Sequence, residues 1–139
     1  MFEKTDDLRQ RIAGKSIPDE KFAAKKASNY VNGKSKMSFG FLEAAYYFNY
    51  LKIGNNNQNI AKYWLQFIRD REGQIESGHE DMGICHVLKA NLLSQLGRYI
   101  ESAAEAQIAL KLFPKPKQEP QIAPCAMFEL GNSLRLQGL

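Results

Sequence analysis

Cysteine is scarce in this sequence. Its 139 residues include two cysteines, Cys85 and Cys125, and neither belongs to a CxxC pair or to a cluster of histidines and cysteines. A structural zinc site needs several such ligands close together, so this distribution argues against one. In a reducing compartment both cysteines are expected to be small, half-buried packing residues rather than partners in a disulfide.

Long apolar runs are missing as well. Every apolar run is far shorter than the roughly 20 residues that a membrane-spanning helix needs. The N-terminal segment MFEKTDDLRQ is charged and has no apolar stretch typical of a secretory signal. These absences predict a cytoplasmic protein without a membrane partner.

A strong excess of charge is absent from most of the chain. The formal net charge is +4, and residues 1–36 hold nine lysines and arginines against five acidic residues, whereas the remainder holds ten of each. Nucleic-acid-binding proteins usually concentrate positive charge more strongly, so a solvated basic face is the favoured interpretation. The alternative is a nucleic-acid-binding protein whose binding weakens steeply with salt. It would use Lys21, Lys25, Lys26, Lys34 and Lys36 with the aromatic cluster Tyr46, Tyr47, Phe48 and Tyr50.

Catalytic motifs are also lacking, since HExxH, GxSxG, GxGxxG and P-loop patterns do not occur. His79 and His86 are seven residues apart, about 10 Å along a helix, too far for two ligands to reach one metal ion easily. Glu101 and Glu105 are expected on the solvated face of their helix, opposite its alanines. We therefore expect no enzymatic activity, no cofactor and no metal.

What the sequence does contain is a series of helical segments separated by polar breaks. Glycine, proline or asparagine occurs where the apolar periodicity stops, and no alternating run typical of a strand is present. One segment places Ile60, Trp64, Phe67 and Ile68 on a single stripe. The pattern predicts an all-α protein with about seven helices, over about residues 3–13, 18–31, 38–51, 59–71, 80–96, 99–113 and from 123 onward.

These segments include an internal repeat. Gly54, Gly97 and Gly138 each follow a helical segment, at intervals of 43 and 41 residues. Before Gly97 and Gly138 the same order recurs: a small residue seven positions earlier, an asparagine six earlier and a leucine four earlier. These residues are Ala90, Asn91 and Leu93 in one copy and Gly131, Asn132 and Leu134 in the other.

Residues 83–114 resemble a tetratricopeptide repeat (TPR), a unit built from two antiparallel helices. The resemblance rests on small residues where the helices approach closely, on a tyrosine after the glycine turn and on a closing proline. The matching residues are Ala90, Gly97, Tyr99, Ser102, Ala106, Ala109 and Pro114. It implies antiparallel helix pairs stacked as a short TPR-like α-solenoid.

We expect one helical-repeat domain over residues 1–139. Its parts are basic N-terminal helices in 1–36, a degenerate repeat in 38–72, the best TPR-like repeat in 80–114 and the first helix of an incomplete repeat in 123–139. The intervals exceed the family's period of about 34 residues, so the connections are longer. Repeat arrays need polar ends, and the last helix has no partner of its own. The sequence leaves three explanations: the chain is a truncated piece, its last helix docks elsewhere, or that helix buries its apolar face in an oligomer. We favour the third, a homodimer through the C-terminal helix.

The resemblance implies a protein–protein interaction module, an adaptor that binds a peptide or partner helix in a groove lined by the first helix of each pair. Candidate partner-binding residues are Phe48, Lys52, Ile84, Val87, Asn91, Gln95, Phe128, Asn132 and Arg135. Val87 and Phe128 stand where relatives that bind a C-terminal carboxylate have lysine, so we expect an apolar or mixed peptide. A small secretion-type chaperone is a further alternative, although such chaperones are commonly acidic and this chain is basic.

Overall fold

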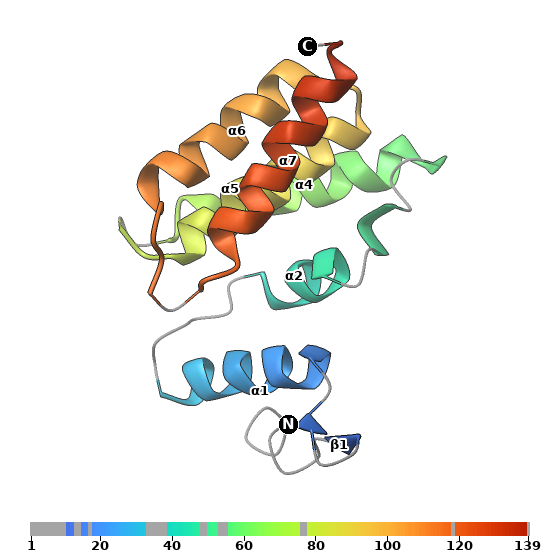
Figure 1. Cartoon of the computed structure of the whole chain (residues 1–139). Helices are drawn as coiled ribbons and strands as arrows, with labels where there is room; N and C mark the ends of the chain where they lie inside the picture. The colour runs from blue at the N-terminus through green and yellow to red at the C-terminus, as the bar shows by residue number, and fades with distance from the viewer. Residues whose placement is uncertain are drawn as a thin grey trace. The chain divides into compact units, whose positions relative to one another are not determined.

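The computed structural model describes residues 11–12, 15–16, 18–32, 39–47, 50–52, 56–75, 78–117 and 119–138 (Figure 1). Six α-helices make up most of the described chain, which confirms the predicted all-α class. The chain divides into two compact units, Met1–Met37 and Ser38–Leu139. The prediction of a single helical-repeat domain stays a prediction.

The first unit contains strands β1 (Arg11–Ile12) and β2 (Lys15–Ser16), followed by helix α1 (Pro18–Val31). The two strands pair in an antiparallel register, Arg11 with Ser16 and Ile12 with Lys15. The predicted helix over residues 3–13 is therefore wrong at its C-terminal end, and so is the expectation that no strand forms. Only two residues separate the strands and one is a glycine, a combination that favours a hairpin over a continuing helix. Residues 1–10 lie outside the described part.

Helix α1 agrees with the sequence prediction. Pro18 occupies the first helical position, where its missing N–H costs no hydrogen bond. The helix ends at Val31, and the backbone N–H of Asn32 donates to the carbonyl of Ser28 at 2.9 Å.

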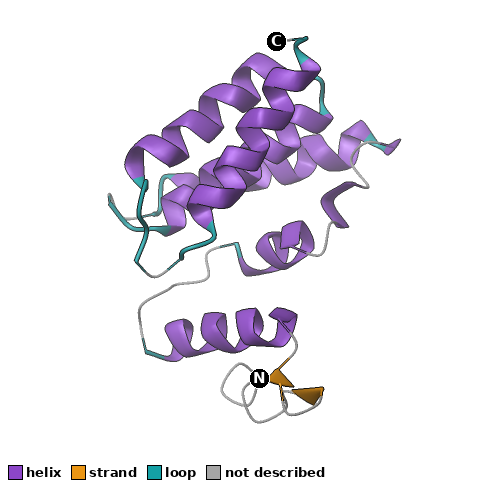
Figure 2. Ribbon diagram, in the orientation of Figure 1, coloured by secondary structure: helices purple, strands orange, loops and turns teal. Residues whose placement is uncertain are grey.

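The second unit contains α2 (Gly40–Tyr47), the short 3-10 helix η2 (Tyr50–Lys52), α4 (Gln58–Glu72), α5 (Asp81–Gln95), α6 (Tyr99–Leu112) and α7 (Ile122–Leu136) (Figure 2). The last four were predicted to within a few residues. The predicted helix over 38–51 was too long, because its described part divides into α2 and η2. Together the stacked helices of this unit form a short TPR-like solenoid.

A glycine turn reverses the chain between α5 and α6. Gly97 has a φ of +77°, which only glycine adopts readily. The N–H of Arg98 donates to the carbonyl of Leu93 at 2.9 Å, and the N–H of Gly97 donates to that of Ser94 at 3.0 Å. This double closure is the Schellman motif, and it brings α6 back along α5. The same positive φ recurs at Gly138, after α7.

Helix α6 packs closely on both α5 and α7 through small residues (Figure 1). Ser102, Ala106 and Ala109 are fully buried on α6, whereas Ala104 is exposed. The Ser102 hydroxyl donates to the carbonyl of Ala90 at 2.6 Å and lies 2.7 Å from the hydroxyl of Ser133. Only small side chains leave room for such contacts between three helices, which confirms the packing role expected for Ala90, Ser102, Ala106 and Ala109.

Helix α5 is the centre of this unit. It contacts α2, α4, α6 and α7, and almost all of its residues from Asp81 to Leu93 are buried. Helix α4 covers it with Ala61, Leu65 and Ile68, so the predicted stripe is displaced by one position. Trp64 and Phe67 lie half-buried at the edge of this contact.

The connection between α6 and α7 is held to the start of α5. The Glu80 carboxylate accepts hydrogen bonds from the backbone N–H groups of Lys117 and Glu119, the latter at 3.1 Å. Ile122, at the start of α7, is then buried against α5 and would touch any side chain added at Gly83. This loop is part of the lengthened interval between repeats.

Candidate interaction surfaces

The repeat relates one face of α5 to one face of α7. At the repeat's offset of 41 residues, His86, Lys89 and Ala90 correspond to Met127, Leu130 and Gly131. On α5 this face is covered by α6. Because α5 and α7 occupy equivalent places in the repeat, the contacts of the first show what the corresponding face of the second is shaped to receive.

On α5 the covered face contains two polar side chains, and both are paired. The Nδ1 atom of His86 lies 2.5 Å from Glu105 of α6, and Lys89 lies 3.3 Å from the same carboxylate. Lys89 also bonds to Glu72 of α4 at 2.8 Å. The sequence predicted a solvated face for Glu105, but its carboxylate instead lies against α5. That prediction was wrong because the residues opposite Glu105 are set by tertiary packing.

The pKa values of this cluster follow from its pairing. Burial acts to raise the pKa of Glu105, but the hydrogen bond from His86 and the charge of Lys89 outweigh it and lower that pKa. Burial acts in the opposite sense on Lys89, and its bond to Glu72 with the nearby Glu105 charge raises its pKa above the ordinary value. Both groups therefore stay ionised at neutral pH, and α4, α5 and α6 are joined by one charged cluster.

On α7 the corresponding face is apolar and open. Met127 is 57% exposed and Phe128 is 67% exposed. Gly131 is exposed, and a Cβ built there would meet nothing within 4 Å. Leu130 and Leu134 are half-buried beside it. We call the surface formed by Met127, Phe128, Leu130, Gly131 and Leu134 the α7 face.

The nine predicted partner-binding residues separate into groups by accessibility. Ile84 and Val87 are 6% and 4% exposed and belong to the core, so their side chains are not accessible to a partner. Phe48 lies outside the described residues. Lys52, Phe128 and Arg135 are exposed, and Asn132 is half-buried and accepts a hydrogen bond from Arg135 at 2.9 Å.

Asn91 and Gln95 join a polar network that the sequence did not predict. Asn91 donates to the Oε1 atom of Glu129 at 3.1 Å, and Tyr46 donates to the same atom at 2.9 Å. Gln95 in turn donates to the side-chain oxygen of Asn91 at 2.6 Å. The network joins α2, α5 and α7. Its only sequence signal is that Glu129 falls on the buried stripe of α7, three residues after Ala126 and four before Ser133.

Glu129 is a buried carboxyl that pairs with no cation among the described residues. It is 1% exposed, and its Oε2 atom has no hydrogen-bond partner in the described structure. Burial raises its pKa, and the hydrogen bonds from Asn91 and Tyr46 offset this only in part. Burial and the neighbouring Glu129 also raise the pKa of Tyr46 well above its ordinary value. At neutral pH the phenol therefore stays protonated and donates a hydrogen bond to the carboxyl.

The described residues show no site for metal chemistry. They contain no group of three or more histidine, cysteine or acidic side chains placed to hold a metal ion. Both cysteines are free thiols, and burial raises the pKa of Cys85 to about 12. His79 accepts a hydrogen bond from the backbone N–H of Asp81 at 3.1 Å. None of the described helices combines the length and apolarity needed to cross a bilayer.

Comparison with known proteins supports the repeat interpretation. The chain is similar to the tetratricopeptide repeat protein ttc-39B of Caenorhabditis elegans, with 28% identity over 130 residues. That alignment covers 91% of this chain and 22% of the relative, so the chain spans about a fifth of the relative's length. No solved structure matches this chain. Residues 1–96 match the family model described as Iml2/tetratricopeptide repeat protein 39. Because that match covers more than half of the sequence, the chain belongs to the Iml2/tetratricopeptide repeat protein 39 family.

Proposed function

We propose that this chain is a protein–protein interaction module, a cytoplasmic adaptor that binds a partner helix on the α7 face. Membership of a TPR family supports an interaction role, since such families are generally non-catalytic scaffolds, and we propose no enzymatic activity. The observation that supports this surface is the contrast between α5 and α7. Helix α6 covers one face of α5, whereas the corresponding face of α7 is exposed and apolar.

The contacts of α6 define the chemistry of the partner. Ser102 and Ala106 are small where α6 meets α5, and Gly131 offers the α7 face the same close approach. Glu105 pairs with His86 and Lys89, but their counterparts Met127 and Leu130 cannot pair with a carboxylate. A partner helix should therefore have small residues at the Ser102 and Ala106 positions and an apolar residue at the Glu105 position.

This proposal includes only some of the groove residues expected from the sequence. Of the nine predicted residues, Lys52, Phe128 and Arg135 are exposed, and Asn91, Gln95 and Asn132 are half-buried. Arg135 lies on α7 seven residues after Phe128, which belongs to the α7 face. A peptide or helix that contacts them would meet one large apolar side chain and one cation, in keeping with a mixed rather than an acidic partner.

The proposal can be tested with two peptides that copy α6. Both contain residues 98–113, and one carries the substitution Glu105→Leu. We expect the Leu peptide to bind the full chain about tenfold more tightly in fluorescence anisotropy, because a buried, unpaired carboxylate costs more than about 1 kcal/mol. Met127→Glu should abolish this binding. Ile100→Glu, which places the same charge on an apolar side chain of α6 that is 76% exposed, should not.

Adding a positive charge to α7 tests whether the partner helix aligns with α7 as α6 aligns with α5. Leu130→Lys restores on α7 the cation that Lys89 supplies on α5, so this variant should reverse the preference and favour the Glu105 peptide. Equal binding of both peptides, or binding that survives Met127→Glu, would contradict the proposal. Light scattering over a dilution series tests the homodimer expected from the sequence. A dimer that Met127→Glu dissociates would show that a second copy, not a separate partner, covers the α7 face.

A further inference from the structure

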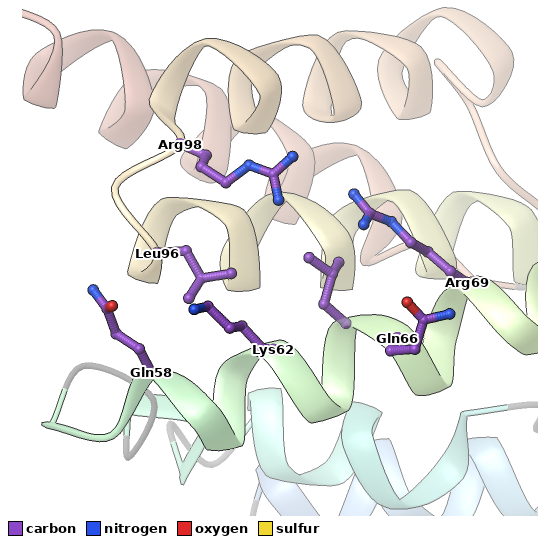
Figure 3. A pocket seen from close by; sticks show the side chains of 7 residues that line it. Gln58, Lys62, Gln66, Arg69, Leu96 and Arg98 are labelled. Carbon is purple, nitrogen blue, oxygen red and sulfur yellow. The ribbon is translucent and has the colours of Figure 1, made fainter.

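A concave site that shares no residue with the α7 face lies between α4 and the turn that joins α5 to α6. It is a cavity of about 380 Å³, within the usual size range of ligand pockets. Lys62, Arg69 and Arg98 point their cationic groups toward its space (Figure 3). The remaining lining residues are Gln58, Leu65, Gln66 and Leu96.

The positive charge of this site is only partly neutralised. Arg98 donates two hydrogen bonds to Glu101, at 2.8 and 2.5 Å. The pKa of Glu101 is lowered first by its hydrogen bond with Arg98, and the charge of Arg69 contributes to the same shift. Neither Lys62 nor Arg69 forms an ion pair within the described residues. Glu101 pairs with Arg98 and is influenced by the charge of Arg69, so positive charge remains at this site for an anionic ligand to offset.

The spacing of the cations on α4 gives the shape of the ligand. Lys62 and Arg69 are seven residues apart on one helix, which corresponds to about 10.5 Å along its axis. In an extended peptide of the polyproline II type, which has three residues per turn, side chains three residues apart lie on the same face about 9 Å apart. Leu65 is buried and Leu96 is half-buried, and both line the site, so it also offers apolar contacts.

We propose that this pocket binds an extended acidic peptide of a partner protein, with two carboxylates three residues apart and an apolar side chain between them. One carboxylate pairs with Lys62 and the other with Arg69, while the apolar side chain contacts Leu65 and Leu96. The amide of Gln58 makes no hydrogen bond within the described part of the chain and is available to the peptide backbone. This site is separate from the α7 face and goes beyond the helix-binding function proposed above.

The test uses the full chain and a fluorescent peptide with the core Glu-Leu-Ala-Glu between short Gly-Ser flanks. We expect saturable binding that weakens with added salt, because exposed charges are screened. Lys62→Gln and Arg69→Gln should each weaken it about threefold to tenfold, the range expected for loss of a partly desolvated ion pair. Lys115→Gln removes the same charge from an exposed site outside the pocket and should change the affinity less than about twofold.

Two further peptides test the chemistry and the spacing. The core Gln-Leu-Ala-Gln should not bind measurably, and a core with adjacent glutamates should bind more weakly than Glu-Leu-Ala-Glu. Equal effects of Lys62→Gln and Lys115→Gln would overturn the proposal, because they would indicate general attraction to a basic protein. Displacement by millimolar inorganic phosphate, or equal binding of the adjacent-glutamate peptide, would also overturn it in favour of an unspecific anion site.

The outcomes are independent of those for the α7 face. Met127→Glu should leave binding of the acidic peptide unchanged, and Lys62→Gln should leave binding of the α6-derived Leu peptide unchanged. Circular dichroism of each variant confirms that its helices are retained. Loss of one binding reaction without the other therefore identifies which of the two proposals has failed.

Discussion

Two glycines inside helices differ in what surrounds them. A Cβ added at Gly83 of α5 would lie 2.9 Å from two carbons of Ile122 and from one carbon of Phe113. A Cβ added at Gly131 of α7 would meet nothing within 4 Å. The first glycine is needed for the close approach of the α6–α7 connection to α5. The second is needed by nothing within the described structure.

Gly83→Ala and Gly131→Ala should therefore change stability in opposite directions. We expect Gly83→Ala to lower the free energy of unfolding by about 1–3 kcal/mol, because the added methyl group overpacks the contact with Ile122 and Phe113. Gly131→Ala should raise it by about 0.5–1 kcal/mol, since alanine favours a helix interior over glycine. Urea unfolding of both variants measures this. A stabilising Gly83→Ala would contradict the described packing.

The buried Glu129 carboxyl makes stability depend on pH. Because burial raises its pKa, the folded chain holds this proton more tightly than the unfolded chain does. As pH rises from the ordinary glutamate pKa through the raised value, the unfolded chain binds fewer protons and the free energy of unfolding falls. Tyr46 and Cys125, the titratable neighbours of Glu129, also have raised pKa values and stay neutral in this range.

Glu129→Gln should remove this pH dependence and keep an oxygen for Tyr46 and Asn91. We expect the variant to be more stable than the native chain at neutral pH by on the order of 1 kcal/mol, and the difference to vanish in mild acid. Urea unfolding at several pH values measures both. Glu101→Gln serves as the control, because the lowered pKa of Glu101 places its effect on the acidic side of the ordinary value. The same slope in wild type and Glu129→Gln would refute the assignment.

Among the helices, α6 joins α5 to α7 through a chain of two hydroxyls. Ser102 donates to the carbonyl of Ala90, so the hydroxyl of Ser133 donates to that of Ser102. All three residues are fully buried. Loss of Ser102 therefore leaves the Ser133 hydroxyl without this partner, whereas loss of Ser133 leaves the bond from Ser102 to Ala90 intact.

Ser102→Ala should thus be more destabilising than Ser133→Ala. We expect about 1–3 kcal/mol for the first, which orphans a buried hydroxyl, and about 0.5–1.5 kcal/mol for the second, which removes one hydrogen bond. The double variant should cost less than the sum, because Ser102→Ala alone already breaks the bond between the two serines. Chemical unfolding of the three variants gives the coupling. Additive costs would show that the two hydroxyls do not interact.

The boundaries of α5, α6 and α7 could be predicted because local residues determine them. Gly97 supplies a positive φ, Pro114 cannot continue α6, and the small residues of α6 indicate close packing. The accessible face of each helix was harder to predict. The buried stripe of α4 differs by one position from the apolar one, and Glu105 lies inward because His86 and Lys89 meet it there.

The accessible residues of the candidate site were hard to predict for the same reason. Phe128 and Arg135 are exposed as a groove residue requires, but Ile84 and Val87 are in the core. No periodicity within α5 separates the two cases, because α5 is apolar or buried on nearly every side. The Glu129 network and the basic pocket lined by Lys62, Arg69 and Arg98 could not be predicted, because each combines residues from helices whose arrangement only the tertiary structure determines.

At the scale of the whole molecule, charge and burial are distributed unevenly. The excess positive charge belongs to residues 1–36, and the remaining segment has as many acidic as basic residues. In the unit Ser38–Leu139, burial is concentrated in α5, with α2, α4, α6 and α7 each contacting it. The surrounding helices have exposed large apolar side chains, among them Phe41, Tyr63, Ile100 and Phe128.

The enclosure of α5 sets the order in which the amides of this unit exchange with solvent. An amide of α5 becomes accessible only when several neighbouring helices have separated from it, so its opening requires nearly the full free energy of unfolding. Helix α2 is short and makes the smaller part of these contacts, so its amides should exchange through local opening. Hydrogen exchange followed by mass spectrometry should therefore label α2 first and α5 last. A ligand of the α7 face or of the basic pocket should slow exchange in α7 or α4 while leaving the already slow amides of α5 almost unchanged.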